Sequence, residues 1–466
     1  MPRVAVLNVV GLCERHLGDM TPQISAFARS GSLSAVEPVL PAVTCTAQST
    51  YLTGLPPGEH GAVANGWYDR GLAEVQFWKQ SNHLVRGRKL WEELRSRQPG
   101  FTCSKLFWWY NMYSSADYSI TPRPMYPADG RKFFDVYSWP YSIRSEIKQQ
   151  LGEFPFPGFW GPAAGRSSPA GPPDCATRWI ADSAKWVEEK YSPTLNLVYL
   201  PHLDYNLQRV GPNDPSIATD LKQIDEIVGD LIRFFAARDV RVVLLSEYGI
   251  TPVSRPVHLN RIFRERGWLT IKEELGLELL DAGNSRAFAV ADHQVAHVYV
   301  NDRSILTQVR DAVCGVEGVA TVLGSEEQVA RGLKHERAGD LIAVADAQSW
   351  FTYYYWMEDR RAPDFARCVD IHRKPGYDPA ELFIDPQLLA PKLRIAWRLL
   401  QKKLGFRMLM DLIPLDASLV KGSHGARPDS VLDFPLLVLP GKSSGAPSAP
   451  IPSTAVYGLL RDQVLG

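Results

Sequence analysis

The chain has 466 residues, of which 45% are apolar and 22% are charged, so it can bury a large core in one domain with insertions or in two domains. Lys plus Arg and Asp plus Glu both number 51, which excludes an overall electrostatic field that would attract nucleic acid polymers or an anionic membrane surface. Binding must therefore depend on a local site.

The ends and the cysteines of the sequence indicate an ordinary intracellular protein. The chain begins with a strand-like run, without the basic start and long apolar region of a signal peptide, so we expect a cytoplasmic location. Six cysteines lack the spacing of a metal site or a disulfide framework and are expected to be buried thiols. No apolar run reaches the roughly 18 residues of a spanning helix, so we expect no membrane insertion.

Short β-branched runs alternate with longer helical patterns along the chain, which favours an α/β fold with a mainly parallel central sheet flanked by helices. Three near-continuous apolar runs, at 3–10, 195–200 and 240–246, predict strands that are covered on both faces. Residues 21–31 predict a helix with Pro22 at its first position. Polar side chains follow each strand, at the sheet edge where such folds bind ligands.

Composition also predicts how the chain is divided. One stretch rich in aromatic residues and proline is interpreted as an inserted lid, a later irregular stretch as a second insertion, and the C-terminal residues as a linker-like tail ending in a short helix. The predicted segments are 1–106 (core with the nucleophile turn), 107–178 (lid), 179–281 (central core), 282–365 (second insertion), 366–439 (C-terminal core) and 440–466 (tail).

Thr44 lies in the stretch PAVTCTAQSTYLTG, where a helix is predicted to begin, and two interpretations are open. Its hydroxyl could be a reactive group at a helix N-terminus, where backbone N–H groups favour an anion such as phosphate. It could equally be an N-cap, which is the more common role for threonine there. Polar residues after other strands favour a site: Asp204 follows the second apolar run, Glu247 follows the third, and His424 stands between two glycines.

The wider stretch PAVTCTAQSTYLTGLPPGEHGAVANGWYD resembles the nucleophile segment of the type I phosphodiesterase/nucleotide pyrophosphatase branch of the alkaline phosphatase superfamily. The similarity continues in the family's order through YLPHLDYNLQRVGP and VVLLSEYGI to GSHG. It implies an alkaline-phosphatase-like core and hydrolysis of a small-molecule phosphate ester. It also implies that Thr44 is the nucleophile and that Asn65 donates a hydrogen bond to a phosphate oxygen.

The family's two-metal chemistry is altered in this sequence. Val10 replaces an aspartate, Gln208 replaces a histidine, and Glu247-Tyr248 replaces Asp-His. The resemblance leaves Asp204 and His424 as metal ligands, with Gln208 as a weak oxygen ligand and Glu247 beside the nucleophile. Because an oxygen-dominated set suits a di-zinc centre poorly, we expect at most one well-held divalent cation per chain, Mg, Mn or Zn.

Other clusters leave alternatives open. His293 and His297 have a spacing that can bind metal beside Asp292, although His297 opens an apolar strand and is better interpreted as a core histidine. The segment 372–374, His-Arg-Lys, is either an anion-binding turn or a solvated loop.

Aromatic residues near the predicted nucleophile could bind a ring of the substrate, and we predict Trp67, Tyr68 and Trp108 in this role, with packing of the lid as the alternative. The sequence as a whole predicts a metal-dependent hydrolase of phosphoric esters. A pseudoenzyme that keeps the fold for binding or scaffolding is the alternative, because ligands that would activate the nucleophile have been replaced.

Overall fold

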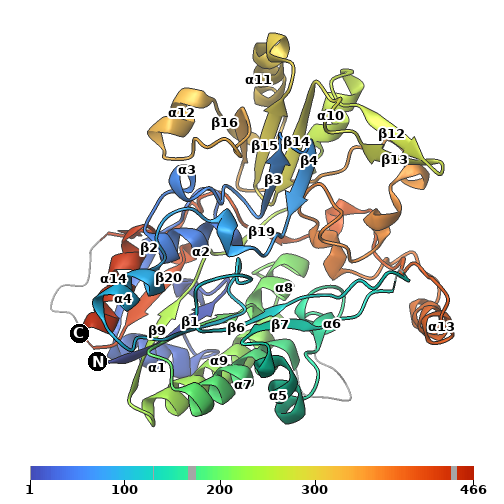
Figure 1. Ribbon diagram of the computed structural model, residues 1–466. Coiled ribbons are helices and arrows are strands. Elements are labelled where there is room, and N and C mark those ends of the chain that lie inside the picture. Colours follow the sequence, from blue (N-terminus) through green and yellow to red (C-terminus); the bar gives the residue numbers. More distant parts are fainter. Residues whose placement is uncertain (1, 130, 166–174, 442–448) are drawn as a thin grey trace.

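A nine-stranded sheet lies at the centre of the computed structural model, which describes residues 2–129, 131–165, 175–441 and 449–466 (Figure 1). Its order is β21 (Ile451–Pro452), β2 (Ser32–Glu37), β20 (Leu436–Leu439), β9 (Val240–Leu245), β1 (Arg3–Val9), β8 (Leu195–Leu200), β5 (Cys103–Leu106), β6 (Tyr118–Pro122) and β7 (Val136–Trp139). The strands from β9 to β6 are parallel, whereas β20 and β7 run antiparallel to their neighbours. The predicted α/β core with a mainly parallel sheet is confirmed, and its three predicted strands are β1, β8 and β9.

Helices cover both faces of the central sheet, which explains why its middle strands are apolar on both sides. One face packs against α1 (Pro22–Ser30), α5 (Ser142–Leu151), α7 (Cys175–Tyr191) and α9 (Ile217–Ala236). The other is covered by α2 (Thr44–Thr53), α4 (Leu90–Arg97) and the C-terminal α14 (Ala455–Leu465). Val456, Leu460 and Val464 of α14 are fully buried, so the C-terminal helix is part of the main core.

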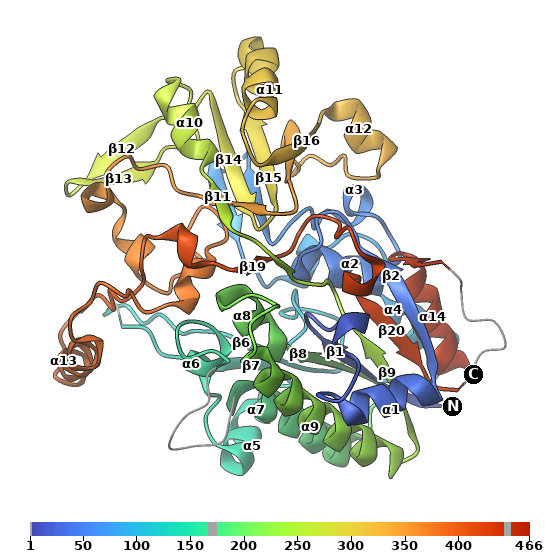
Figure 2. The same ribbon diagram turned by 180° about the vertical axis from the view of Figure 1, so that it is seen from behind.

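A smaller antiparallel sheet lies beyond the carboxyl ends of the central strands (Figure 2). Its order is β14 (Ala287–Asp292), β15 (Val295–Val300), β17 (Leu341–Ala345) and β16 (Val319–Leu323), and α10 (Leu259–Glu265), α11 (Leu306–Cys314) and α12 (Ser325–Ala330) pack around it. These elements enclose a second apolar core, which includes Phe288 and Tyr299.

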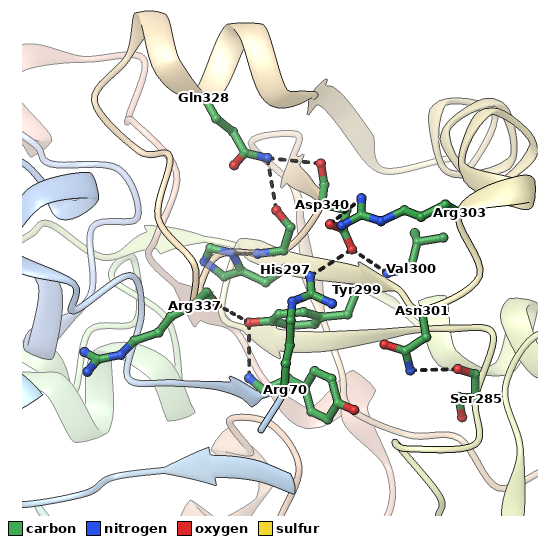
Figure 3. A network of polar contacts seen from close by, with 12 residues as sticks. Arg70, Ser285, His297, Tyr299, Val300, Asn301, Arg303, Gln328, Arg337 and Asp340 are labelled. Carbon is green, nitrogen blue, oxygen red and sulfur yellow. Dashed lines mark hydrogen bonds and ion pairs between the residues drawn. The ribbon is translucent and has the colours of Figure 1, made fainter. Parts of the chain in front are cut away.

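A polar network ties this smaller sheet to the chain that follows the predicted nucleophile turn (Figure 3). The carboxylate of Asp340 accepts hydrogen bonds from Arg70 at 2.9 Å and from the backbone N–H of Val300 at 2.7 Å. Arg303 forms an ion pair with the same carboxylate at 2.7 Å. The network fixes the end of β15, and with it the position of the hairpin that β14 and β15 form.

The remaining elements are short, apart from one helix that stands away from the body. Hairpins and short pairs are formed by β3 (Gly66–Asp69) with β4 (Glu74–Phe77), β10 (Thr251–Pro252) with β19 (Gly422–Ser423), β11 (Arg255–Val257) with β18 (Ser349–Phe351), and β12 (Ile271–Glu274) with β13 (Leu277–Leu280). Helices α3 (Pro57–His60), α6 (Phe156–Phe159), α8 (His202–Arg209) and the protruding α13 (Pro391–Lys403) complete the α-helices of the described residues. Single 3-10 turns occur at Glu14–His16, Asn82–Leu84, Arg303–Ile305, Asp359–Arg361, Asp364–Arg367, Pro379–Leu382, Ala417–Leu419 and Val431–Asp433.

The segment predicted as a lid, 107–178, contributes to two parts of the structure. Its strands β6 and β7 extend the central sheet, whereas α6 and its neighbours line a large cavity. The loop predicted within it includes 166–174, and the predicted linker includes 442–448, both outside the described residues. Across the ranges that the structure describes, no helix combines the length and the apolar character needed to cross a membrane.

Candidate active site

The candidate site is a cavity of about 1110 Å³ at the carboxyl ends of the central parallel strands. Three chain segments that follow β8, β9 and β19 bring polar side chains to it, and the start of α2 lies against them. The turn between β14 and β15 reaches the same place from the smaller sheet. Polar residues converge here because parallel strands end at one edge of the sheet, as the sequence predicts.

Thr44 is the first residue of α2 and lies on the cavity wall. The N-cap is Val43, which has an extended backbone and makes no side-chain cap hydrogen bond, so Thr44 is not the capping residue. Its Oγ1 lies 3.1 Å from the phenol oxygen of Tyr248, which donates a hydrogen bond to Asp204 Oδ1 at 3.1 Å. When the Tyr248 phenol donates its one proton to Asp204, the Thr44 hydroxyl is left as the donor in its contact with Tyr248.

The second carboxylate oxygen of Asp204 continues this chain of hydrogen bonds. It accepts from Gln208 Nε2 at 2.9 Å, and Gln208 Oε1 accepts from the Tyr377 hydroxyl at 3.0 Å. Burial raises the pKa of Asp204 to about 7, and the hydrogen bonds from Tyr248 and Gln208 oppose the shift. The sequence predicted Gln208 as a weak metal ligand. In this structure its Nε2 donates one hydrogen bond and its Oε1 accepts another.

Two neutral imidazoles present unpaired nitrogens in the cavity. His424 Nδ1 donates to the carbonyl of Ala42 at 2.7 Å, and His293 Nδ1 donates to Asp292 Oδ1 at 2.7 Å. In each ring this leaves Nε2 as a buried acceptor that has no hydrogen-bond partner among the described residues. Burial holds the pKa of both imidazoles well below the usual range, so they are neutral at pH 7.

Stacking positions these rings against two phenols. His424 packs face to face on Tyr248 with 3.6 Å between ring centroids and an angle of 6°, and His293 packs on Tyr377 at 3.6 Å. The two imidazoles lie 3.7 Å apart. His293 has φ 60° in the hairpin turn, an uncommon conformation for a residue with a side chain, and the next residue, Gln294, donates its backbone N–H to the carbonyl of His424 at 2.9 Å.

Glu247 lies beside the nucleophile segment but is closed off from the cavity. Its Oε1 accepts hydrogen bonds from Asn8 at 2.5 Å and from Gln48 at 2.6 Å, while Oε2 has no partner. Burial raises its pKa to about 8, and hydrogen bonds from Gln48, Asn8 and the Thr44 side chain oppose the shift. The carboxyl group is therefore mostly protonated at pH 7. Gln48 was not singled out by the sequence, because its role depends on packing of α2 against the residue after β9.

Asn65 connects the helix start to the hairpin of the smaller sheet. Its Oδ1 accepts from the backbone N–H of Cys45 at 3.0 Å, and its Nδ2 donates to Asp292 Oδ1 at 3.1 Å. Its own backbone N–H donates to the other oxygen of Asp292 at 2.8 Å. Burial raises the pKa of Asp292 to about 6, and the hydrogen bond from the Asn65 backbone is the largest opposing effect.

The predicted aromatic residues lie in packed cores and not on the cavity wall. Trp108 is fully buried in the main core, Trp67 packs under Arg337, and Tyr68 packs edge-on against Phe288. The aromatic side chains that line the cavity belong to other positions: Trp78, Trp109, Phe134, Phe156, Phe159, Trp160, Tyr199, Tyr205, Tyr248, Tyr377 and Phe406. The sequence of an aromatic-rich stretch does not indicate which of its rings faces the cavity.

Two further sequence clusters have structural roles. His297 Nε2 donates to the carbonyl of Val63 at 3.1 Å and its Nδ1 accepts from Gly339 at 3.0 Å, which confirms it as a core histidine. Lys374 is fully buried between Asp378 at 2.6 Å and Glu381 at 2.7 Å. Its charge is therefore already balanced and is not available to bind an anion.

The side chains around the cavity offer donors for one cation rather than two. His424 Nε2 lies 3.8 Å from Asp204 Oδ1, so these two predicted ligands are adjacent. Glu247 and Gln208, the other two, are held by protein hydrogen bonds. Among the residues that the structure describes, no group of three or more His, Cys, Asp or Glu side chains is arranged to hold a metal ion. Asp204 and His424 are thus the two predicted ligands that lie next to each other, and the described residues show no comparable arrangement for a second cation.

The sequence model of the type I phosphodiesterase/nucleotide pyrophosphatase family matches residues 4–378. The chain belongs to this family. An uncharacterised pyrophosphatase/phosphodiesterase of Schizosaccharomyces pombe is 20% identical over 268 residues, which cover 56% of this chain and 47% of the relative. The chain thus spans about half the length of this curated relative.

Solved structures confirm the fold of this family member. Murine ectonucleotide pyrophosphatase/phosphodiesterase 5, solved as an inactive variant in complex with AMP, has a TM-score of 0.59 at 15% identity, with 100% of this chain and 95% of that chain covered. Phosphonoacetate hydrolase from Sinorhizobium meliloti, in complex with phosphonoformate, has a TM-score of 0.60 at 13% identity, with 99% and 96% covered. At these identities the likeness concerns the fold alone.

Proposed function

We propose that this chain hydrolyses phosphoric esters of small molecules by attack of Thr44 Oγ1 on phosphorus. The observation that carries the proposal is the hydroxyl of Thr44 at the start of α2, hydrogen-bonded to Tyr248 on the wall of the cavity. A helix N-terminus favours the charge of a phosphate group. The family membership, and the AMP and phosphonoformate bound by the two structural neighbours, support a ligand with a phosphate or phosphonate group.

The hydrogen-bond chain from Thr44 gives its proton a path. As Oγ1 attacks, its proton passes to the phenol oxygen of Tyr248, and the Tyr248 proton passes to Asp204 Oδ1. Tyr248 needs no net ionisation for this transfer, which suits a phenol whose pKa is raised by burial. The bond from Oγ1 to phosphorus forms while the ester P–O bond breaks, and the leaving alkoxide takes up a proton from solvent water.

The second half of the reaction restores Thr44. Water attacks phosphorus and releases one proton to solvent, the bond between Oγ1 and phosphorus breaks, and the proton stored on Asp204 returns through Tyr248 to the hydroxyl. The unpaired Nε2 of His293 can accept a hydrogen bond from the water and orient it, because this ring is neutral. Product release leaves a phosphate or a phosphomonoester, depending on whether a mono- or diester was bound.

Asp204 and His424 would hold one divalent cation, Mg, Mn or Zn, whose positive charge would stabilise the attacked phosphate when bound. Asp204 would bind the cation through Oδ2 in place of its hydrogen bond from Gln208, because Oδ1 serves in the proton path. Glu247 and Gln208 would join only after losing their present hydrogen bonds. Asn65 would donate to a phosphate oxygen through the N–H that Asp292 does not use. A cytoplasmic location remains a prediction of the sequence.

The test compares wild-type protein with Thr44→Ala and Thr44→Ser on aryl phosphate mono- and diesters, with Mg, Mn or Zn supplied in turn. Thr44→Ala should lose turnover by several orders of magnitude, whereas Thr44→Ser should retain a measurable rate. Mass spectrometry of acid-quenched wild-type protein should find a phosphoryl or phosphoryl-ester adduct on Thr44. Equal rates for wild type and Thr44→Ala would exclude this nucleophile. No turnover by wild type with any ester and metal would favour the pseudoenzyme.

A further inference from the structure

Helix α13 and the residues around it carry an unusual share of the exposed apolar side chains. No residue of α13 is buried, and the helix stands at the margin of the molecule in both views (Figures 1 and 2). Leu393 is 72% exposed and Trp397 is 58% exposed. Other large apolar side chains that are exposed in this region are Leu389, Leu399, Leu400, Leu404, Phe406 and Leu409. An apolar patch of this kind marks a surface that contacts something else.

The spacing of these residues gives the helix an apolar stripe on its outer side. Leu393, Trp397, Leu400 and Leu404 recur at intervals of three and four residues, which places them on one face of a helix. Ile395 and Leu399 instead line the cavity. The helix therefore separates the interior of the cavity from an outward apolar face.

The same helix carries positive charge without any acidic residue of its own. Within Pro391–Lys403 the basic residues are Lys392, Arg394, Arg398, Lys402 and Lys403. Arg394 and Arg398 pair with Asp411, which fastens the inner side of the helix to the chain that follows. Lys392 and Lys403 form no ion pair with any other described residue and lie beside the apolar stripe. A stripe of Leu and Trp flanked by unpaired lysines is the pattern of a helix that lies in a membrane interface.

A neighbouring loop extends this surface. Lys402 Nζ donates to the carbonyl of Lys132 at 3.5 Å and lies 5.9 Å from the ring centre of Phe134. Arg407 Nε donates to the carbonyl of Asp129 at 3.2 Å. Exposed aromatic and apolar side chains of this loop are Met125, Tyr126, Phe133 and Phe134. Two segments far apart in the sequence therefore form one basic and apolar surface.

This surface borders the candidate active site. Arg131, Lys132, Lys402 and Arg407 line the same cavity as Thr44. The first four are partly or largely exposed and Thr44 is buried, so the cavity runs from the basic and apolar surface inward to the predicted nucleophile. A membrane or partner that covers α13 would therefore lie close to the entrance of the cavity.

We propose that α13 and the residues 125–129 and 131–134 dock the protein on the surface of an anionic lipid bilayer. The apolar stripe would enter the boundary between head groups and acyl chains, and the flanking lysines would contact anionic head groups. Charge complementarity favours lipid over another copy of this chain, because two copies would bring basic helices together. The neutral net charge of the chain confines this attraction to the local surface, since exposed charges act over about 8 Å at physiological salt.

Docking would present the entrance of the cavity to the bilayer. An amphiphilic phosphate ester could then move from the membrane to Thr44 with its apolar part against the cavity wall, lined by Leu399, Phe406 and Met410. This consequence rests on the proposed function, whereas docking itself does not.

The experiment measures cosedimentation of the full chain with vesicles of phosphatidylcholine alone or mixed with phosphatidylserine. Wild-type protein should bind the mixed vesicles, release at high salt, and show a blue shift of tryptophan emission as Trp397 leaves water. Lys392→Glu/Lys403→Glu should weaken binding by at least about 25-fold, since each lost basic charge accounts for roughly fivefold. Leu393→Ser/Leu400→Ser should also lose binding.

The matched control is Leu275→Ser/Lys222→Glu, which changes an exposed leucine and an exposed lysine elsewhere on the molecule and should bind normally. All variants should keep the wild-type circular dichroism and the wild-type rate on soluble aryl esters, because none of these residues lines the cavity. If the wild-type protein hydrolyses no ester, that result counts against the proposed function and leaves vesicle binding as a separate result.

Three outcomes would overturn docking: no binding of wild type to either vesicle, equal binding to neutral and anionic vesicles, or undiminished binding by both α13 variants. Light scattering of the protein without lipid tests for a fourth such outcome, self-association of the chain. A concentration-dependent dimer that both variants abolish would assign the surface to a second copy of the chain.

Discussion

The hydroxyl of Thr44 lies 3.1 Å from the phenol oxygen of Tyr248, although 204 residues separate them in the sequence. Tyr248 stands where the family motif has a histidine, and its hydroxyl reaches both Thr44 and Asp204. A position where the resemblance implies a metal ligand thus carries a hydrogen-bonding link between the proposed nucleophile and Asp204 in this chain. The substitution places a phenol instead of an imidazole beside Thr44, and it keeps a hydrogen-bonded path from Thr44 to Asp204.

Tyr248→Phe tests this link directly. The change removes the hydroxyl and keeps the ring that stacks on His424, so turnover should fall by about 10²-fold or more. Steady-state kinetics on an aryl ester would measure it. Tyr51→Phe is the matched control, because Tyr51 is also buried and donates to the carbonyl of Ser246 at 3.0 Å. If the two variants lose activity equally, the effect belongs to packing and not to the relay.

His424→Ala should lower metal content and activity together, since loss of a ligand also removes the charge that it holds. Metal analysis of protein purified without chelator or affinity metal should find at most one divalent ion per wild-type chain. His83→Ala removes an exposed imidazole and should change neither quantity. Two fully occupied zinc ions in the wild type would contradict the ligand assignment, and the unpaired Nε2 of His293 would then be the first additional donor to test.

Lys105 gives the fold a pH-dependent stability. Its Nζ donates to the carbonyls of Trp109 at 2.8 Å and Tyr110 at 2.7 Å, and burial lowers its pKa from 10.5 to about 7. Between these two values the unfolded chain binds more protons than the folded one, so this residue makes stability rise with pH, by up to about 1.4 kcal/mol per pH unit.

Lys105→Met should remove this dependence. Urea unfolding at several pH values from about 7 to about 9 would show the free energy of unfolding of wild type rising relative to the variant. A constant difference between the two proteins across this range would show that Lys105 has the same pKa folded and unfolded.

The C-terminal helix should be required for stability. Leu460 is fully buried between α14 and the main core, so Leu460→Ala should lower the free energy of unfolding by about 2–5 kcal/mol. Asp462→Ala, on the exposed side of the same helix, should stay within about 0.5 kcal/mol of wild type. Chemical denaturation of both variants would measure the contrast. Equal stability of the two would mean that α14 packs only loosely.

The sequence by itself determined the local elements and the family. The predicted strands at 3–10, 195–200 and 240–246 are found as β1, β8 and β9, because a strand covered on both faces must be apolar along its whole length. The spacing of residues around Thr44 was specific enough to indicate the family over most of the chain. Both signals depend on residues that are near one another in the sequence.

Only the tertiary structure decided which side chains meet. Glu247 accepts hydrogen bonds from Asn8 and Gln48, and Gln208 accepts one from Tyr377. The sequence gives no local signal for such pairings, since they depend on how distant segments pack. The same reason applies to the aromatic residues, where burial of Trp108 and exposure of Trp397 follow from which face of each element meets a neighbour. The local sequence pattern determines the helices and strands, whereas long-range packing determines which side chains come into contact.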